Sequence, residues 1–346
     1  MQRYINKISR SGRPLLLLLA VCTACTSRKK APDVSHIPVT VSIARFDQDL
    51  IAVDTNRVAE GLDSLHAQYP VFLPAYLQHI MAFGAYNEST DRIPVQTRLM
   101  LVNKDFRSLQ DAVQHKFRDL RWLEQDLAQG FRYMKYYFPS FRVPHVVTFI
   151  SAIGNYGAVT IDTLLGIGLD MYMGSNFPIY ARLPDYPAYM VRRFSPEYIT
   201  TNCIQALVQQ RYPMPGAGAK LVELMVAAGR EQYLLEQVLP NTPDTIRTGY
   251  TKAQLEWCRD NEMMIWQYFI QNELLYKTDW QETMHFIGDG PSTQGMPPGS
   301  PGRIGYFVGL QIIRKYMDRH PEVTLQQLMD NKDLVGIFSE SKYRPR

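Results

Sequence analysis

The spacing of apolar residues changes twice along the chain, and these changes restrict the fold more than any other sequence feature. The first part has helical spacing in four segments, near residues 56–68, 74–83, 93–115 and 119–136. A strand-like segment at 39–44 precedes them. Short β-branched or apolar runs follow, and they predict a small sheet at 144–150, 158–161 and 166–173.

Helical spacing then returns for the rest of the sequence. Pro196 opens a predicted helix that continues to about Arg211, because proline is well accommodated in a first helical turn. Three more helices are predicted at 219–238, 251–276 and 302–319. No internal repeat and no linker long enough to force a boundary divides residues 39–346. We therefore expect one mainly helical α+β domain with a small mixed sheet.

The N-terminal residues have the composition of a lipoprotein signal. Four basic residues and no acidic residue precede a short apolar run, Leu15–Val21, which is typical of a secretory signal. The run is too short to span a bilayer, which takes roughly 20 apolar residues. Cys22 and Cys25 compete as lipidation site, and the small residue before Cys25 favours that one. We predict a signal peptide at 1–24, acyl chains such as palmitate on Cys25, and a lipid-anchored tether at 25–38; a secreted protein with an unmodified cysteine is the alternative.

Removal of this segment changes the net charge. The full sequence has 37 Lys and Arg residues against 33 Asp and Glu residues, and four of the basic ones, with no acidic one, lie in 1–24. The remainder has 33 of each sign, without the basic excess of a nucleic-acid-binding surface. We expect no nucleic-acid partner. The basic residues at 28–30 suit anionic lipid headgroups, so we expect a membrane contact at the anchor, by default facing the periplasm.

Two cysteines remain beyond the anchor, Cys203 and Cys258. An oxidising envelope would allow a disulfide between them. Each also lies at an apolar helical position, where a buried free thiol is common. We favour two buried thiols.

The sequence holds no complete catalytic or metal-binding motif. No two of the seven histidines are four residues apart, so the H-E-x-x-H zinc pattern is absent. No C-x-x-C pair follows Cys25, and neither G-x-S-x-G nor a P-loop occurs. We predict no metal ion and no cofactor, and expect the protein not to be an enzyme.

A loop rich in glycine and proline at 287–302 is the strongest candidate for a binding site. These residue types fix a loop in particular backbone conformations, and long loops of fixed shape are often functional. His285, Asp289 and Arg303 flank or lie in it, and they are candidates for binding an anion or for acid–base chemistry. The alternative is that His285 and Asp289 bind loop backbone and that Arg303 only precedes the next helix.

Two acidic residues fall within apolar elements and define a second candidate cleft. Glu262 lies on the apolar stripe of the helix at 251–276, where it either lines a cleft or pairs with a buried arginine, and pairing is favoured. Asp170 lies in the predicted strand at 166–173, where it either faces a cleft or is solvated.

Gly305 and Gly309 are four residues apart on the last long predicted helix. In a membrane this spacing would indicate helix dimerisation. Arg314 and Lys315 follow too soon for a membrane span. We therefore predict that the two glycines allow another element of the core to pack closely.

Several ordered blocks resemble the gliding motility lipoproteins of the GldB type. They lie at 43–50, 69–72, 165–174 and 183–194, and the clearest is the loop and helix start at 285–305. The resemblance covers essentially the whole sequence. It implies a cell-envelope protein with partners in a motility or secretion machine, acting as a non-catalytic binding or scaffold component. The alternative is an envelope hydrolase that uses the region from His285 to Arg303.

The order of strands and helices is also similar to a zincin-type peptidase. In an active zincin the first of two helices carries two histidines and a glutamate, and the second carries a further glutamate ligand. The matching positions here are 201–207 and 227–229, which hold none of these residues. The similarity implies a degenerate scaffold whose catalysis has been lost, because a catalytic zinc needs three protein ligands.

Overall fold

Four short strands form a mixed sheet in the order β1-β2-β4-β3. Strands β1 (Ile43–Ala44), β2 (His145–Phe149) and β4 (Leu164–Gly168) are parallel, and β3 (Ala158–Ile161) is antiparallel to β4 at the edge. The computed structural model describes residues 31–86 and 92–345. These residues confirm a mainly helical α+β domain with a small mixed sheet.

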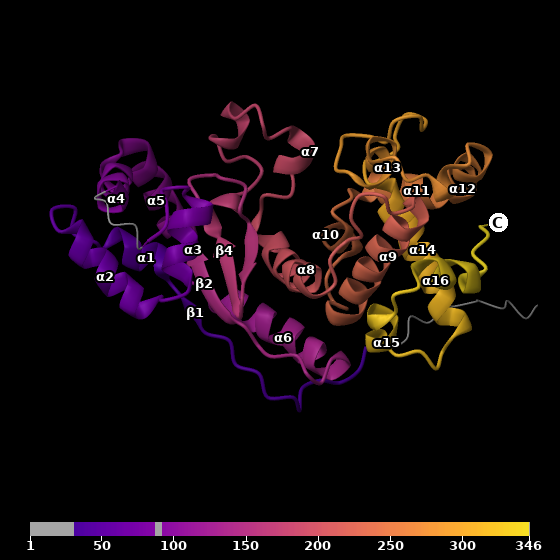
Figure 1. Ribbon diagram of the computed structural model, residues 1–346, viewed down its shortest axis with the longest axis horizontal. Coiled ribbons are helices and arrows are strands. Elements are labelled where there is room, and N and C mark those ends of the chain that lie inside the picture. The colour runs from indigo at the N-terminus through magenta and orange to yellow at the C-terminus, as the bar shows by residue number, and fades with distance from the viewer. Residues whose placement is uncertain (1–30, 87–91, 346) are drawn as a thin grey trace, which may run out of the picture. The chain divides into compact units, whose positions relative to one another are not determined.

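Helices surround this sheet on both sides. Six precede β2: α1 Phe46–Ile51, α2 Val58–Gln68, α3 Phe72–Ala75, α4 Arg92–Val102, α5 Lys104–Lys116 and α6 Arg121–Tyr137. The later ones are α7 Ala188–Val191, α8 Ile199–Arg211, α9 Leu221–Val238, α10 Asp244–Thr248, α11 Lys252–Asp260, α12 Glu262–Gln271, α13 Trp280–Ile287, α14 Ile304–Arg319, α15 Leu325–Asp330 and α16 Leu334–Ser341. Figure 1 shows the sheet between the N-terminal helices, in indigo, and α8.

The compact unit spans Asp33–Arg346. Val34, within the expected tether, is buried. In the described part of the sequence, no helix combines the length and the apolar character that a membrane span requires.

Several predicted elements differ from the observed ones. Only residues 43–44 of the segment at 39–44 form a strand, and the segment at 93–115 is two helices that meet at Asn103. The helix predicted at 251–276 is divided at Asn261, where α11 ends and the Asn261 side chain also donates to the Trp257 carbonyl at 2.8 Å. The strand predicted at 166–173 ends at Gly168, and a 3₁₀ turn, Leu169–Met171, follows. This turn brings the Asp170 carboxylate to the loop after β2.

A buried ion pair fixes the start of the domain to the sheet. Asp47 is 1% exposed, and Arg45 binds both of its oxygens, at 3.0 and 2.7 Å. Thr148 on β2 donates to the same carboxylate at 2.5 Å. The Phe46 ring between these residues packs against Tyr76 with ring centres 4.9 Å apart. The block 43–50 is therefore a structural anchor for β2.

Helix α9 is the centre of the C-terminal part and crosses α14 at a glycine pair (Figure 1). A Cβ atom on Gly309 would overlap the Met225 carbonyl oxygen and lie 3.0 Å from the Gly229 nitrogen. A Cβ atom on Gly305 would lie 3.1 Å from the Phe286 carbonyl oxygen. The prediction that Gly305 and Gly309 allow close packing is confirmed.

Arg230, on the same central helix, is buried and holds the end of α15. Its Nη1 donates to the carbonyls of Leu328, Met329 and Asn331, at 3.3, 3.1 and 2.6 Å. Carbonyls at a helix C-terminus lack partners within the helix. The Arg230 guanidinium therefore donates hydrogen bonds to these carbonyls and ties the C-terminal helices to the core.

Candidate functional site

A buried carboxylate on α9 is enclosed by two amides from α8. Glu231 is 4% exposed, and its two oxygens accept hydrogen bonds from Gln205 Nε2 at 2.6 Å and Gln209 Nε2 at 2.9 Å. The two glutamines are four residues apart and so share one face of α8. Burial raises the pKa of Glu231, while the amides and the charge of Arg303 partly oppose this rise. Both carboxylate oxygens thus have a donor from the protein.

A cavity of about 200 Å³ lies beside these amides, between α8 and the start of the edge strand β3. Its lining residues are all uncharged: Asn155, Gly157, Ala158, Met171, Tyr172, Phe194, Asn202, Gln205, Ala206 and Gln209. Amide side chains offer both donors and acceptors. The cavity can therefore accept an uncharged polar group, such as a peptide unit, and pack apolar atoms against its two aromatic residues.

A second cavity lies under the loop that the sequence identified. Asp289 and Arg303 both line it, together with Arg192 and Arg193 from the segment after α7. Arg193 forms an ion pair with Asp289. The Arg303 guanidinium carbon is 3.9 Å from the centre of the Tyr306 ring. Two of the three predicted loop residues therefore meet at one place.

The loop itself is held by several internal hydrogen bonds. The Arg303 N–H donates to the Gly288 carbonyl at 3.2 Å, and the Thr293 hydroxyl donates to the Pro301 carbonyl at 2.5 Å. The Tyr250 hydroxyl donates to the Arg303 carbonyl at 2.7 Å. These bonds agree with a long loop of fixed shape.

The third predicted residue, His285, is not part of this cavity. It lies on α13 and is exposed, and it is absent from the lining that Asp289 and Arg303 share. The structure therefore does not assemble the three residues into an acid–base group, and the hydrolase alternative loses its proposed histidine.

The two residues of the second candidate cleft are also separate. Of the two alternatives for Asp170, a cleft or a solvated position, the solvated one is wrong, because Asp170 is fully buried and accepts from the Ser151 N–H at 2.9 Å and the Ile153 N–H at 2.6 Å. Glu262 accepts from the Tyr343 hydroxyl at 2.7 Å, where an arginine was expected. Asp170 holds a loop and Glu262 holds the C-terminal segment, so these contacts give each a structural role.

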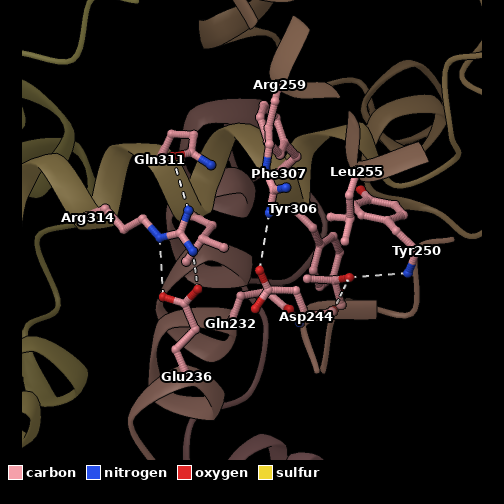
Figure 2. Close-up of a pocket in the computed structure, with 12 residues that line it drawn as sticks. Gln232, Glu236, Asp244, Tyr250, Leu255, Arg259, Tyr306, Phe307, Gln311 and Arg314 are labelled. Carbon is pink, nitrogen blue, oxygen red and sulfur yellow. Dashed lines mark hydrogen bonds and ion pairs between the residues drawn. The ribbon is translucent and has the colours of Figure 1, made fainter. Parts of the chain in front are cut away.

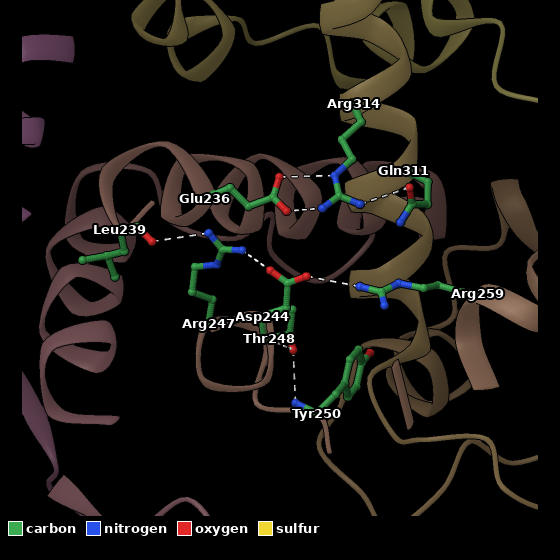
Figure 3. A network of polar contacts seen from close by, with 9 residues as sticks. All are labelled: Glu236, Leu239, Asp244, Arg247, Thr248, Tyr250, Arg259, Gln311 and Arg314. Atoms are coloured by element: carbon green, nitrogen blue, oxygen red, sulfur yellow. Dashed lines mark hydrogen bonds and ion pairs between the residues drawn. The ribbon is translucent and has the colours of Figure 1, made fainter. Parts of the chain in front are cut away.

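A pocket between α9, α11 and α14 lies next to the loop cavity, with which it shares Tyr250 (Figure 2). Its charged groups are paired. Arg314 binds Glu236 through two nitrogens, and Asp244 accepts from Arg259 at 3.2 Å. Figure 3 shows that these pairs, with Arg247, join α9, α10, α11 and α14. The charged residues of this pocket thus form ion pairs that connect helices.

The two cysteines are free and buried, in agreement with the favoured interpretation. Burial raises the pKa of Cys258 to about 12, so the thiol is protonated at neutral pH. Within residues 31–86 and 92–345 no group of three His, Cys, Asp or Glu side chains could hold a metal ion. Cys25 lies outside the described residues.

Sequence reasoning missed Gln209 and Glu231 near the first cavity and the arginines at 192–193 in the second. The zincin comparison placed the facing positions at 201–207 and 227–229, whereas Gln209 and Glu231 lie beyond these ranges. Glutamines at 205 and 209 have one-face spacing, and that signal could have found them. The two arginines at 192–193 belong to no sequence motif that would have marked them as site residues.

The raised pKa of Glu231 predicts a pH dependence of stability. Because the folded protein holds this proton more tightly than the unfolded chain, the contribution of Glu231 to stability falls as pH rises above the unfolded value of about 4.3. Compared with Glu231→Gln, the wild type should lose free energy of unfolding over this window. Urea unfolding of both proteins between mildly acidic and neutral pH measures the difference, and a difference independent of pH would contradict the assignment.

The sequence model of one protein family, described as gliding motility protein GldB, matches residues 27–345. No curated protein sequence and no solved structure matches this one.

Proposed function

Because the chain belongs to the family of the gliding motility protein GldB, we propose that it is a non-catalytic binding component of the motility machinery on the cell envelope. A lipid on Cys25 holds it at the membrane, and the basic residues at 28–30 add attraction to anionic headgroups. The domain from residue 33 onward binds another envelope protein.

The observation that carries this proposal is the arrangement around Glu231. A carboxylate that acts as a general base needs a free oxygen directed at the substrate. Here Gln205 and Gln209 donate to both oxygens and separate Glu231 from the adjacent cavity. The cavity walls are then amides and aromatic rings, which bind polar groups but transfer no protons at neutral pH.

The geometry also supports the likeness to a zincin that has lost its catalysis. Two side chains four residues apart on α8 and one carboxylate on α9 converge at one point. This is the spacing at which two histidines and a glutamate bind catalytic zinc. If the likeness holds, glutamines take both histidine positions, and Ala206 takes the position of the catalytic glutamate that would follow the first of them.

The partner segment binds in an extended conformation along β3. An edge strand offers free backbone groups, and a peptide can add to it as a further strand. β3 forms the edge of the sheet, and the cavity beside its first residues receives one side chain of the peptide. Backbone hydrogen bonds supply affinity in this arrangement, and the cavity supplies specificity.

The test places a photo-cross-linking residue at Thr160 of the full-length protein in its own cells. We expect a cross-link to one envelope protein, and Ala206→Trp should abolish it because the indole fills the cavity. Lys315→Trp, which adds the same side chain at an exposed position of α14, should leave the cross-link unchanged.

Circular dichroism of the purified variants verifies that both remain folded. An unchanged cross-link in folded Ala206→Trp would refute binding at this cavity. The hydrolase alternative would gain if the cross-linked protein were cut in the wild type and left intact by Glu231→Gln.

A further inference from the structure

The cavity under the loop at 288–303 contains more positive than negative charge. Three arginines line it, Arg192, Arg193 and Arg303, and Asp289 is the one acidic residue of its lining. These residues come from two separate parts of the sequence, the segment after α7 and the loop before α14. The fold therefore brings these two parts of the sequence together at the cavity.

Only one of the three guanidinium groups has an acidic partner among the described residues. Arg193 pairs with Asp289. Arg192 donates to the Gly249 carbonyl at 2.7 Å, which is a neutral acceptor. Arg303 lies against the Tyr306 ring, and in residues 31–86 and 92–345 no carboxylate is within 4.0 Å of Arg192 or Arg303. Two of the arginines that line the cavity therefore have no carboxylate in direct contact among the described residues.

Arg192 is partly removed from water, so its missing counter-charge has an energetic cost. Burial lowers the pKa of Arg192, which shows that the surroundings compensate its charge incompletely. Burial alone would lower the pKa of Arg303, but Tyr306, Tyr250 and the charges of Asp289 and Glu231 outweigh it and raise this pKa, so the guanidinium is held in its charged form. A bound anion would remove this cost.

The size and lining of the cavity limit the anion. The free space is about 20 Å³, little more than a single water molecule requires. Two glycines approach closely on one wall, because a Cβ atom on Gly302 would lie 2.7 Å from the Gly290 nitrogen. The space suits one small planar group, and guanidinium forks match a carboxylate through two parallel hydrogen bonds.

We propose that Arg192 and Arg303 form a carboxylate-binding site, which takes either the C-terminus or an acidic side chain of a polypeptide. The site is separate from the cavity beside β3, and it stands whether or not that cavity binds a partner. Asp289 acts as an internal competitor, because it occupies Arg193 and repels a second carboxylate.

The test is acetate binding to the full-length protein in detergent, followed by calorimetry or by changes in the NMR spectrum. We expect saturable binding that weakens about tenfold or more in Arg192→Gln and in Arg303→Gln, since each removes charge-assisted hydrogen bonds. Arg118→Gln removes an exposed arginine that does not line the cavity, and this variant should bind acetate as the wild type does. Asp289→Asn should tighten binding, because it frees Arg193.

Acetylated dipeptides distinguish the two sources of the carboxylate. A free C-terminal acid that binds better than its amide identifies a polypeptide terminus, and an amidated peptide with an internal glutamate that binds identifies an acidic side chain. Absence of saturable acetate binding to the wild type would overturn the proposal. It would also be overturned by binding of inorganic phosphate in preference to acetate, or by equal binding in folded Arg192→Gln and Arg303→Gln. None of these results bears on the Thr160 cross-link.

Discussion

Gly309→Ala should lower the free energy of unfolding by about 3 kcal/mol, because it forces an added methyl group into a backbone that cannot yield. The added carbon would overlap the Met225 carbonyl oxygen on α9. Since α9 and α14 share the most extensive contact of any two elements among the described residues, relief requires the central helices to separate. The better helix propensity of alanine returns only about 1 kcal/mol.

Urea unfolding followed by circular dichroism measures this effect. Gly216→Ala is the matched control, because Gly216 is exposed and a Cβ atom there would meet nothing within 4 Å. We expect the control to stay within about 0.5 kcal/mol of the wild type. A Gly309→Ala protein as stable as this control would show that the helices cross at a greater distance than described.

Replacing both amides around Glu231 by imidazoles should create a zinc site. In the double variant Gln205→His and Gln209→His, two ring nitrogens and the Glu231 carboxylate would meet where the amides now meet the carboxylate. Two histidines and one glutamate are a complete protein ligand set for zinc with one open position. We expect stoichiometric zinc after purification without chelator, against none in the wild type.

Elemental analysis and calorimetric titration measure the gain. Adding Glu231→Gln to the double variant should remove the zinc, because two histidines alone leave the site incomplete. If the folded double variant bound no zinc, the convergence of α8 and α9 on one point would be refuted. Zinc that persisted in the triple variant would show that other ligands hold it.

The sequence predicted the secondary-structure elements better than the tertiary contacts between them. Helical and strand periodicity reports burial on one face, so the sheet segments and the helix at 302–319 were found. The role of Gly305 and Gly309 was also predictable, because small residues one turn apart leave a groove on a helix. The divisions at Asn103 and Asn261 were missed, since no glycine or proline marks either place.

The candidate site was predicted only in part, for a physical reason. Asp289 and Arg303 lie near each other in the sequence, and a constrained loop kept them together. Arg192, almost a hundred residues earlier, reaches the same cavity through tertiary packing that no local pattern encodes. Asp170 was misread because strand alternation does not reveal where a strand ends.

The parallel pairing of β1 with β2 affects the order in which this protein can fold. Ile43 lies beside Val146 in the sheet. The hydrogen bond that completes the anchor joins the Asp47 carboxylate to Thr148, 101 residues later in the sequence. Contacts between residues so far apart in the sequence are slow to form, because a long loop must close before the contacts stabilise it. As synthesis proceeds from the N-terminus, helices α1–α6 emerge before their partner strand, and the Phe72 and Tyr76 rings lack their contact with Phe149 until β2 follows. The N-terminal helices therefore expose apolar surface, and with it a risk of aggregation, until the strands of the sheet are available to cover it.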